Sequence, residues 1–293
     1  MNYIVYMLVY PIIWLISMLP FRVLYFISDG VYYLLYYVFG YRKKTVAGNL
    51  KLVFPEKTDK ELKTIEKRFY HHLVDVFIEM LKSFTVSKEA VYKRYTFTNV
   101  EIFDELFKDG KSIALVGPHY ANWEWIMSLD SFVKYNGVAA YTKINNPYFN
   151  NKMLKSRSKF GTNMIQTSRI IAEMQKNKKE NVPTIYGLLS DQSPHISKAF
   201  YWSKFLGVKV PIHTGAEMLA KRFDMNVVYI ATKKIKRGHY ETTFSLITDN
   251  ATSIPDYQIT DIFLEKVEAQ IRKEPAYYFW THRRFKHKDK APD

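Results

Sequence analysis

The first apolar block of the chain covers its amino-terminal 21 residues, which carry no charged side chain. A membrane span needs roughly 20 mainly apolar residues, so this block is a minimal candidate for one. Pro11 would kink such a helix and Pro20 would end it. The block has neither the basic start nor the small-residue cleavage site of a secretory signal peptide. We therefore predict an N-terminal membrane helix, with a helix buried in the core as the alternative.

A second aromatic-rich segment lies at residues 23–41, interrupted only by Asp29 and closed by Arg42, Lys43 and Lys44. Tyrosines beside basic residues are typical of a membrane interface, and the positive-inside rule places the remainder of the chain in the cytoplasm. The pattern predicts membrane-anchoring or interfacial helices at residues 1–41 and one further domain at residues 42–293.

The next periodic stretch begins at a capping box formed by Thr58 and Glu61, whose side chains can satisfy free backbone N–H groups. Apolar residues then recur at helical spacing: Leu62, Ile65, Phe69, Leu73, Val76, Phe77 and Met80. This pattern predicts a core helix, on which His71 and His72 have structural roles.

From about Lys111 the chain alternates between short apolar runs and longer amphipathic ones. The runs predict strands at 112–117, 138–142, 163–166 and 184–189, and helices at 121–135, 146–160, 169–176, 214–223 and 260–273. Residues 226–234 and 239–248 read as a hairpin around Arg237-Gly238, so we expect the basic run 233–237 to be an exposed tip. The alternation predicts an α/β fold with a mixed central sheet covered by helices.

Composition narrows the possible chemistry. Lys and Arg number 43 against 28 Asp and Glu, a formal charge of +15 that favours an anionic partner: nucleic acid, a phospholipid surface, a phosphorylated lipid or an acidic protein. The chain has no cysteine, which excludes disulfides, a cysteine nucleophile and thiolate zinc sites. Neither the G-x-S-x-G motif of serine hydrolases nor a P-loop is present.

The strongest local signal is VGPHYANWEW at residues 116–125, where a buried strand ends and His119 falls in a turn. Two residues five apart on one helix diverge by roughly 140°. His119 and Glu124 can therefore meet only if the histidine lies in the turn and the glutamate in the first helical turn. Such a pair suits a general base and the carboxylate that orients it. Gly117 would let a substrate approach the backbone. The alternative for His119 is a purely structural role.

Three further sites carry candidate polar residues. Arg157 shares a helix face with apolar side chains, so it needs an anionic partner, and a structural ion pair is the alternative to a functional role. Asp191-Gln192 follows an apolar strand and could bind a substrate, orient a catalytic loop or cap its own loop. The tail 280–288, WTHRRFKHK, reads as a basic-aromatic patch for anionic lipid headgroups or nucleic acid, with solvated surface as the alternative.

Several of these segments together resemble the lipid A biosynthesis acyltransferases of the late, lauroyl/myristoyl type. His119 and Glu124 match the H-x4-D/E motif of that family. The resemblance continues through residues 42–56, 141–161, SDQSP at 190–194, 205–215 and YYFWTHRRFK at 277–286, and so covers nearly the whole chain.

The resemblance implies a glycerolipid-acyltransferase-like catalytic domain at residues 42–293. It would move a fatty acyl chain from acyl-acyl carrier protein to a hydroxyl of a lipid A precursor, without a metal or cofactor. The implied catalytic residues are His119 as general base, Glu124 and Arg157. The implied substrate-binding residues are Gly117, Asn122, Asp191, Gln192, His282, Arg283 and Arg284.

The partners expected from this resemblance are acyl carrier protein, the lipid A precursor and inner-membrane lipids, but not nucleic acid. The catalytic domain would face the cytoplasm from the inner membrane. Two alternatives stay open. An enzyme of the same family could act on another bacterial lipid, such as a glycolipid, an aminolipid or a phosphatidylinositol mannoside. A non-catalytic, membrane-tethered protein could bind anionic lipid or nucleic acid, which would leave the motif at residues 116–124 unexplained.

Overall fold

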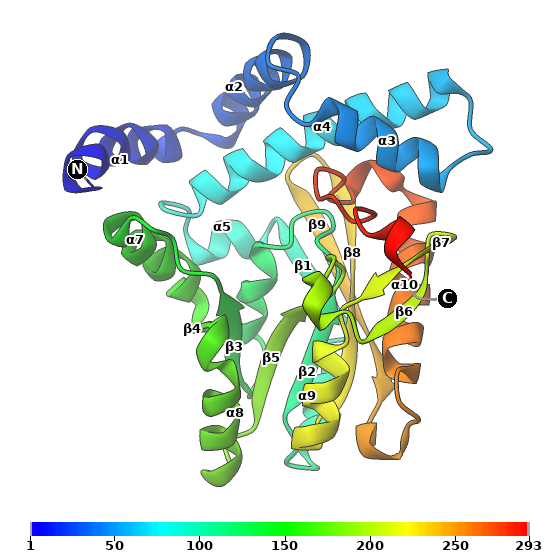
Figure 1. The fold of residues 1–293 in the computed structure, drawn as a ribbon. Helices are drawn as coiled ribbons and strands as arrows, with labels where there is room; N and C mark the ends of the chain where they lie inside the picture. The colour runs from blue at the N-terminus through cyan, green and yellow to red at the C-terminus, as the bar shows by residue number, and fades with distance from the viewer. Residues whose placement is uncertain (1, 292–293) are drawn as a thin grey trace.

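The centre of the computed structural model, which describes residues 2–291, is a seven-stranded sheet of order β1-β9-β8-β2-β5-β3-β4 (Figure 1). Within this sheet five neighbouring pairs are parallel, and β8 with β9 is its one antiparallel pair among the described strands. The strands are β1 Tyr95–Thr98, β2 Ile113–Gly117, β3 Asn136–Tyr141, β4 Asn163–Gln166, β5 Thr184–Leu189, β8 Asn226–Lys236 and β9 His239–Thr248. The predicted mixed α/β sheet is confirmed.

Helices cover both faces of this sheet. Every residue of β2 is buried, as expected for a central parallel strand with neighbours on both sides. Ile113 and Leu115 join a cluster with side chains of α6 (Glu101–Phe107) and the 3₁₀ helix η2 (Trp125–Ser131). Ala114 and Val116 belong instead to the main core, where the contributing helices include α8 Ile170–Lys179, α9 Gly215–Phe223 and α10 Gln258–Lys273.

The long helix α4 (Asp59–Lys82) starts at the predicted capping box. The Glu61 amide donates to Thr58 Oγ1 at 3.3 Å, and the Thr58 amide donates to Glu61 Oε2 at 2.8 Å. Most of the predicted apolar stripe is buried, but Phe77 is 46% exposed and its assignment to the core is wrong. The buried side of the last turns runs instead through Val74, Ile78 and Glu79.

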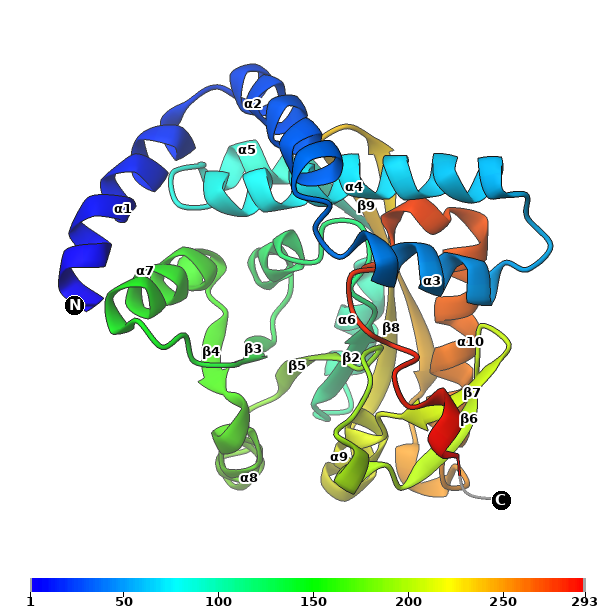
Figure 2. The same ribbon diagram turned by 45° about the horizontal axis from the view of Figure 1, so that its top comes forward.

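Four N-terminal elements lie at one end of the sheet, where α1 contacts α7 and α4, and α2 packs on α4 (Figure 2). They are α1 Asn2–Met18, α2 Phe21–Tyr33, the π-helical turn η1 Leu34–Val38 and α3 Lys43–Val53. Side chains along α1 are mostly exposed, so the alternative of a buried core helix is wrong.

The predicted transmembrane helix is not confirmed. Within residues 2–291 no single helix is both long and apolar enough to cross a membrane, and α1 has 17 residues. Residues 21–38 together with Lys43–Val53 meet the requirement by length and composition only as a pair bent by 84°. As predicted, Pro20 interrupts the helix: α1 ends at Met18, and Pro20 is the N-cap of α2.

Two segments differ from the predicted elements. The helix expected at 121–135 is wrong, because residues 118–124 form a loop and only η2 follows it. An antiparallel hairpin of β6 (Tyr201–Phe205) and β7 (Val208–Ile212) was not predicted. Its Leu206-Gly207 turn has φ values of 52° and 84°, the left-handed backbone that two-residue hairpins require. The remaining helices are α5 Lys88–Tyr92 and α7 Pro147–Arg157, the latter near its predicted position.

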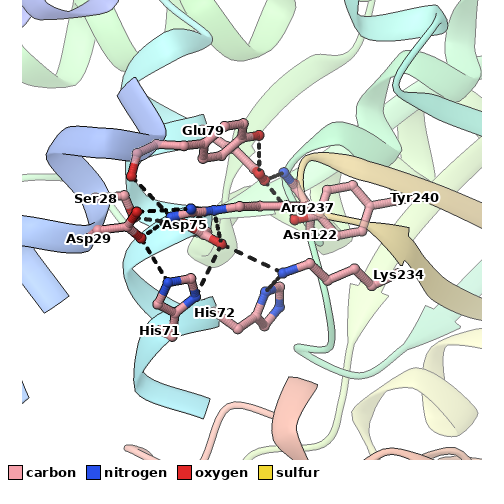
Figure 3. A network of polar contacts seen from close by, with 11 residues as sticks. Ser28, Asp29, His71, His72, Asp75, Glu79, Asn122, Lys234, Arg237 and Tyr240 are labelled. Carbon is pink, nitrogen blue, oxygen red and sulfur yellow. Dashed lines mark hydrogen bonds and ion pairs between the residues drawn. The ribbon is translucent and has the colours of Figure 1, made fainter. Parts of the chain in front are cut away.

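The tip of the β8–β9 hairpin is not the solvated loop that its basic residues suggested (Figure 3). Arg237 donates to Asp29 on α2 at 2.6 Å and to Asp75 on α4 at 2.7 Å. Lys234 lies 3.6 Å from the same Asp75 carboxylate and is nearly buried. The exposed-tip prediction holds for Lys233 and Lys236, which are exposed. It fails for Lys234 and Arg237, because the fully buried Asp75 carboxylate draws both cations to it.

Replacing Arg237 by alanine should lower the free energy of unfolding by about 3 kcal/mol, because it leaves a buried carboxylate with weaker pairing. Urea unfolding followed by circular dichroism measures this change. Lys236→Ala, an exposed position on the same hairpin, should change the free energy by no more than about 0.5 kcal/mol. Equal effects of the two variants would contradict a specific role for Arg237.

Candidate active site

The pairing register of two parallel strands brings His119 and Asp191 together. Gly117 at the end of β2 lies opposite Leu189 at the end of β5. Two residues beyond each strand, at the same edge of the sheet, His119 Nδ1 lies 2.7 Å from Asp191 Oδ1. Edges of this kind are where open α/β sheets place their sites. The carboxylate on the imidazole ring is therefore Asp191, in place of the predicted Glu124.

Electrostatics favour the charged forms of both members of this pair. Burial by itself would lower the pKa of His119, but the carboxylates of Asp191 and Glu124 outweigh it and hold that pKa above its ordinary value. Burial alone would raise the pKa of Asp191, yet the charge and hydrogen bond of His119 bring it below its ordinary value. With Asp191 on Nδ1, the neutral ring carries its proton there, and Nε2 is the basic nitrogen.

Aromatic and amide side chains surround the imidazole. The ring of Trp123 lies 5.6 Å from it and that of Phe279 6.1 Å, centroid to centroid. The amide nitrogen of Gln192 lies 3.4 Å from His119 Nε2, so the Asp191-Gln192 pair borders the histidine as a unit. Neither Trp123 nor Phe279 was predicted as a site residue, although they lie in the motifs at 116–125 and 277–286.

The loop after His119 is held by the C-terminal segment. The Ala121 amide donates to the Tyr277 carbonyl at 2.9 Å, and the Phe279 amide donates to the His119 carbonyl at 3.2 Å. Ala121 adopts a φ of +51°, a left-handed conformation that costs a residue with a Cβ on the order of 1 kcal/mol. These bonds replace those of an α-helix, which explains why the predicted helix does not begin at residue 121.

Asn122 fixes the second half of this loop. Its amide oxygen accepts the backbone N–H of Glu124 at 3.1 Å and of Trp125 at 3.0 Å. Its amide nitrogen donates to Glu79 at 2.7 Å, and the side chain is fully buried. Asn122 thus holds the backbone of the loop. We had expected this side chain to contact substrate, but it points into the protein interior.

Glu124 is paired with Arg157, the last residue of α7. The guanidinium donates through Nε to Oε2 at 2.9 Å and through Nη2 to Oε1 at 2.6 Å, a two-pronged geometry that is among the stronger side-chain pairings. The prediction that Arg157 has an anionic partner on an otherwise apolar face is confirmed, and the partner is Glu124.

One cavity of ≈ 510 Å³ brings His119, Glu124 and Arg157 to a common wall. Its size is that of a ligand site. Apolar side chains from several elements supply much of the lining, among them Leu115, Trp123, Ile126, Met127, Met164, Leu188, Leu219 and Ile230. A smaller cavity of ≈ 190 Å³, bounded by Met80, Phe84, Met153 and Phe160, shares Glu124 and Arg157 with it.

Gly117 has a packing role. A Cβ at this position would lie 3.2 Å from the side chain of Ile230 on the neighbouring strand β8. The Ile230 side chain therefore fills the space above Gly117. The expected approach of a substrate to the Gly117 backbone has no room at this position.

The tail 280–288 does not form one basic patch. Arg284 is 1% exposed, donates to the Pro211 carbonyl and stacks over Phe205, so it lies inside the fold. His282 Nε2 accepts the Ser193 amide at 3.1 Å, and burial lowers its pKa to about 4 despite the Asp191 carboxylate, so it is neutral. The prediction is wrong for Trp280, Arg284 and Phe285, because this part of the tail is buried between α3 and the β6–β7 hairpin. Arg283, Lys286 and Lys288 are exposed, and of the expected binding residues in the tail Arg283 alone is exposed.

Other chemistry has little support in the described part of the chain. Residues 2–291 contain no group of three or more histidine, aspartate or glutamate side chains arranged to hold a metal ion.

Thr214 occupies the N-cap position of α9 without a side-chain capping bond. His213 borders the large cavity, and burial lowers its pKa, assisted by the charges of Arg284 and Lys198.

Comparison with known proteins places the chain in a family. The family model for bacterial lipid A biosynthesis acyltransferases matches residues 1–287. The lipid A biosynthesis lauroyltransferase of Escherichia coli (strain K12) is 22% identical over 276 residues, which cover 94% of this chain and 89% of that protein. The chain belongs to the bacterial lipid A biosynthesis acyltransferase family and is an acyltransferase, so the non-catalytic alternative is wrong.

Replacing Asp191 by asparagine should lower the pKa of His119. The carboxylate raises that pKa, whereas burial lowers it, so removing the charge makes the imidazole neutral at lower pH. NMR titration of ¹³C-labelled histidine measures the shift, and the spectrum of His119→Gln assigns the signal. Asp130→Asn, a buried carboxylate bonded to Thr162, should leave the His119 titration in place. An unshifted His119 signal in Asp191→Asn would contradict the pairing.

Proposed function

We propose that this enzyme transfers a fatty acyl group from acyl-acyl carrier protein to a hydroxyl of a lipid A precursor. The observation that carries the proposal is the His119–Asp191 pair at the wall of a large, mainly apolar cavity. A basic nitrogen beside an apolar cavity suits a reaction between a lipid hydroxyl and a fatty thioester. The family membership supports the same reaction class.

In the proposed reaction His119 is the general base. The acceptor oxygen bonds to the thioester carbonyl carbon while its proton passes to Nε2. The tetrahedral intermediate then collapses with cleavage of the carbon–sulfur bond, and the leaving thiolate takes the proton from the imidazolium. Asp191 stabilises the imidazolium through Nδ1 and fixes the tautomer that makes Nε2 the base. No acyl-enzyme is required.

Glu124 and Arg157 act as a unit in this proposal. Glu124 stabilises the imidazolium through space, since its carboxylate adds to the raised pKa of His119 without a hydrogen bond to the ring. Arg157 holds Glu124 in place and brings positive charge to the cavity wall, where it can stabilise the negative oxygen of the intermediate. Gln192 beside the imidazole, together with exposed Arg283, is our candidate for contact with the acceptor.

The N-terminal 41 residues are proposed to lie in the membrane interface, with the catalytic domain at 42–293 on the cytoplasmic side of the inner membrane. Large apolar side chains project from α1 and α2 into solvent, among them Leu8 and Phe26 at 67% and 80% exposure. Basic residues flank them at Arg22, Arg42 and Lys44, as in interfacial helices that bind anionic lipid.

Lipid A from cells that lack this gene should carry one acyl chain fewer than normal, and the wild-type gene should restore it. His119→Ala should not restore it, because removing a general base lowers the rate by about 10²–10⁴-fold. Mass spectrometry of extracted lipid A measures the missing chain. His239→Ala, a histidine on the β8–β9 hairpin outside the cavity, should complement like the wild type. Unchanged lipid A in the deletion strain would redirect the proposal to another bacterial lipid acceptor.

Replacing both Leu8 and Phe26 by glutamate should weaken binding to vesicles of phosphatidylethanolamine and phosphatidylglycerol, because charges then enter the apolar face. Co-sedimentation with the vesicles measures the bound fraction. Phe200→Glu, at a 70% exposed aromatic residue far along the chain from α1 and α2, is the matched control and should bind normally. Normal binding by the double variant would argue against an interfacial role for these helices.

A further inference from the structure

A buried glutamate outside the cavity connects three parts of the fold (Figure 3). Glu79 on α4 is fully buried. Its Oε1 accepts the hydroxyl of Tyr25 on α2 at 2.8 Å. Its Oε2 accepts the Asn122 amide at 2.7 Å and the hydroxyl of Tyr240 on β9 at 2.8 Å. A core helix, an N-terminal helix, a sheet strand and the loop of the active site therefore meet on one carboxylate.

The orientation of the Asn122 side chain is fixed, and it directs the amide nitrogen toward Glu79. The amide oxygen already accepts two backbone N–H groups, so the nitrogen must point the other way, toward the carboxylate. A neutral glutamine in place of Glu79 would lose acceptor capacity while its three donors stayed buried, and each unpaired buried group is unfavourable.

The charge of Glu79 depends on these donors. Burial and the nearby Asp75 carboxylate raise the pKa of Glu79 to about 7, while the hydrogen bonds of Tyr25 and Tyr240 and the charge of Lys234 lower it. A carboxylate in this position is stabilised by its donors, and it in turn fixes each donor with charge-assisted hydrogen bonds.

The loop that Asn122 holds needs such support. Ala121 has a left-handed backbone. Glu124 is the N-cap of η2, and the amides of Glu124 and Trp125 both donate to the Asn122 oxygen. A displacement of Asn122 would release the amides of Glu124 and Trp125 and let the Glu124 carboxylate move relative to His119. Displacements of about 1 Å near reacting groups can cost on the order of 100-fold in rate.

We propose that Glu79 is a positioning residue for acyl transfer, which fixes the Glu124 loop through Asn122 and ties that loop to α2 through Tyr25. The role in acyl transfer rests on the function proposed above. Helix α2 is held at this point by a second contact, since Ser28 and Asp29 bind Asp75 and Arg237. The N-terminal helices are then part of the catalytic scaffold as well as the membrane-binding surface.

The test compares Glu79→Gln with Glu217→Gln in the full-length protein. Glu217 on α9 is also buried and also accepts three hydrogen bonds, from the Tyr257 amide, the Thr260 amide and the Thr260 hydroxyl. Both variants should unfold at lower temperature, because each removes a buried carboxylate from its donors. Glu217 has no contact with the loop, so it controls for the loss of stability alone.

Two readouts separate positioning from stability. In Glu79→Gln, kcat for acyl transfer from acyl-acyl carrier protein should fall on the order of 10- to 100-fold with little change in KM. Hydrogen–deuterium exchange of the peptide 118–127 should become faster, because the Glu124 and Trp125 amides lose their fixed acceptor. Glu217→Gln should keep kcat and the exchange of this peptide, and Tyr25→Phe should show a weaker form of both Glu79→Gln effects.

Equal kcat values in the two glutamine variants, with unchanged exchange at 118–127, would overturn the proposal. If Glu79→Gln does not fold, Tyr25→Phe and Tyr240→Phe are compared by the same readouts with Tyr186→Phe, which loses a buried hydrogen bond to Asn177. Wild-type protein without acyl-transfer activity would instead refute the proposed function, and the exchange measurement would still decide whether Glu79 holds the loop.

Discussion

The whole candidate site depends on the register of two parallel strands. Because Gly117 and Leu189 are partners across β2 and β5, the residues two positions further on leave the sheet side by side. That register puts a carboxylate against the imidazole of His119 and sets which nitrogen is basic. A shift of one residue would send the side chains to opposite faces and abolish the pair.

Around this pair the fold replaces regular structure with specific polar contacts. The C-terminal segment supplies backbone partners for the loop after His119, and Asn122 supplies the partner for the next two amides, those of Glu124 and Trp125. The cost of a left-handed Ala121 is offset by these bonds. Irregular backbone here is what allows Glu124 to face Arg157 at the cavity wall, where an uninterrupted helix would turn it elsewhere.

Buried charge joins the N-terminal helices to the same site. Asp75 and Glu79 stand one helical turn apart on α4 and collect donors from α2, from the hairpin of β8 and β9 and from the active-site loop. Such groups are expensive to bury alone, so each depends on these partners in the folded state. The surface of α1 and α2 that faces away from the protein is apolar, and the inward surface of α2 is tied down by these contacts.

The sequence by itself determined the alternating α/β fold, most of its strands, the capping box at Thr58, and His119 and Glu124 as candidate residues of one site. Those signals are local: hydrophobic period, capping chemistry and a short motif with its spacing. Tertiary structure alone decided that Asp191 orients His119, that Arg284 is buried and that Arg237 is not a solvated tip. These depend on strand order, register and packing between segments more than 70 residues apart. No local pattern encodes such distances, because a buried charge or a strand end finds its partner only when the chain has folded.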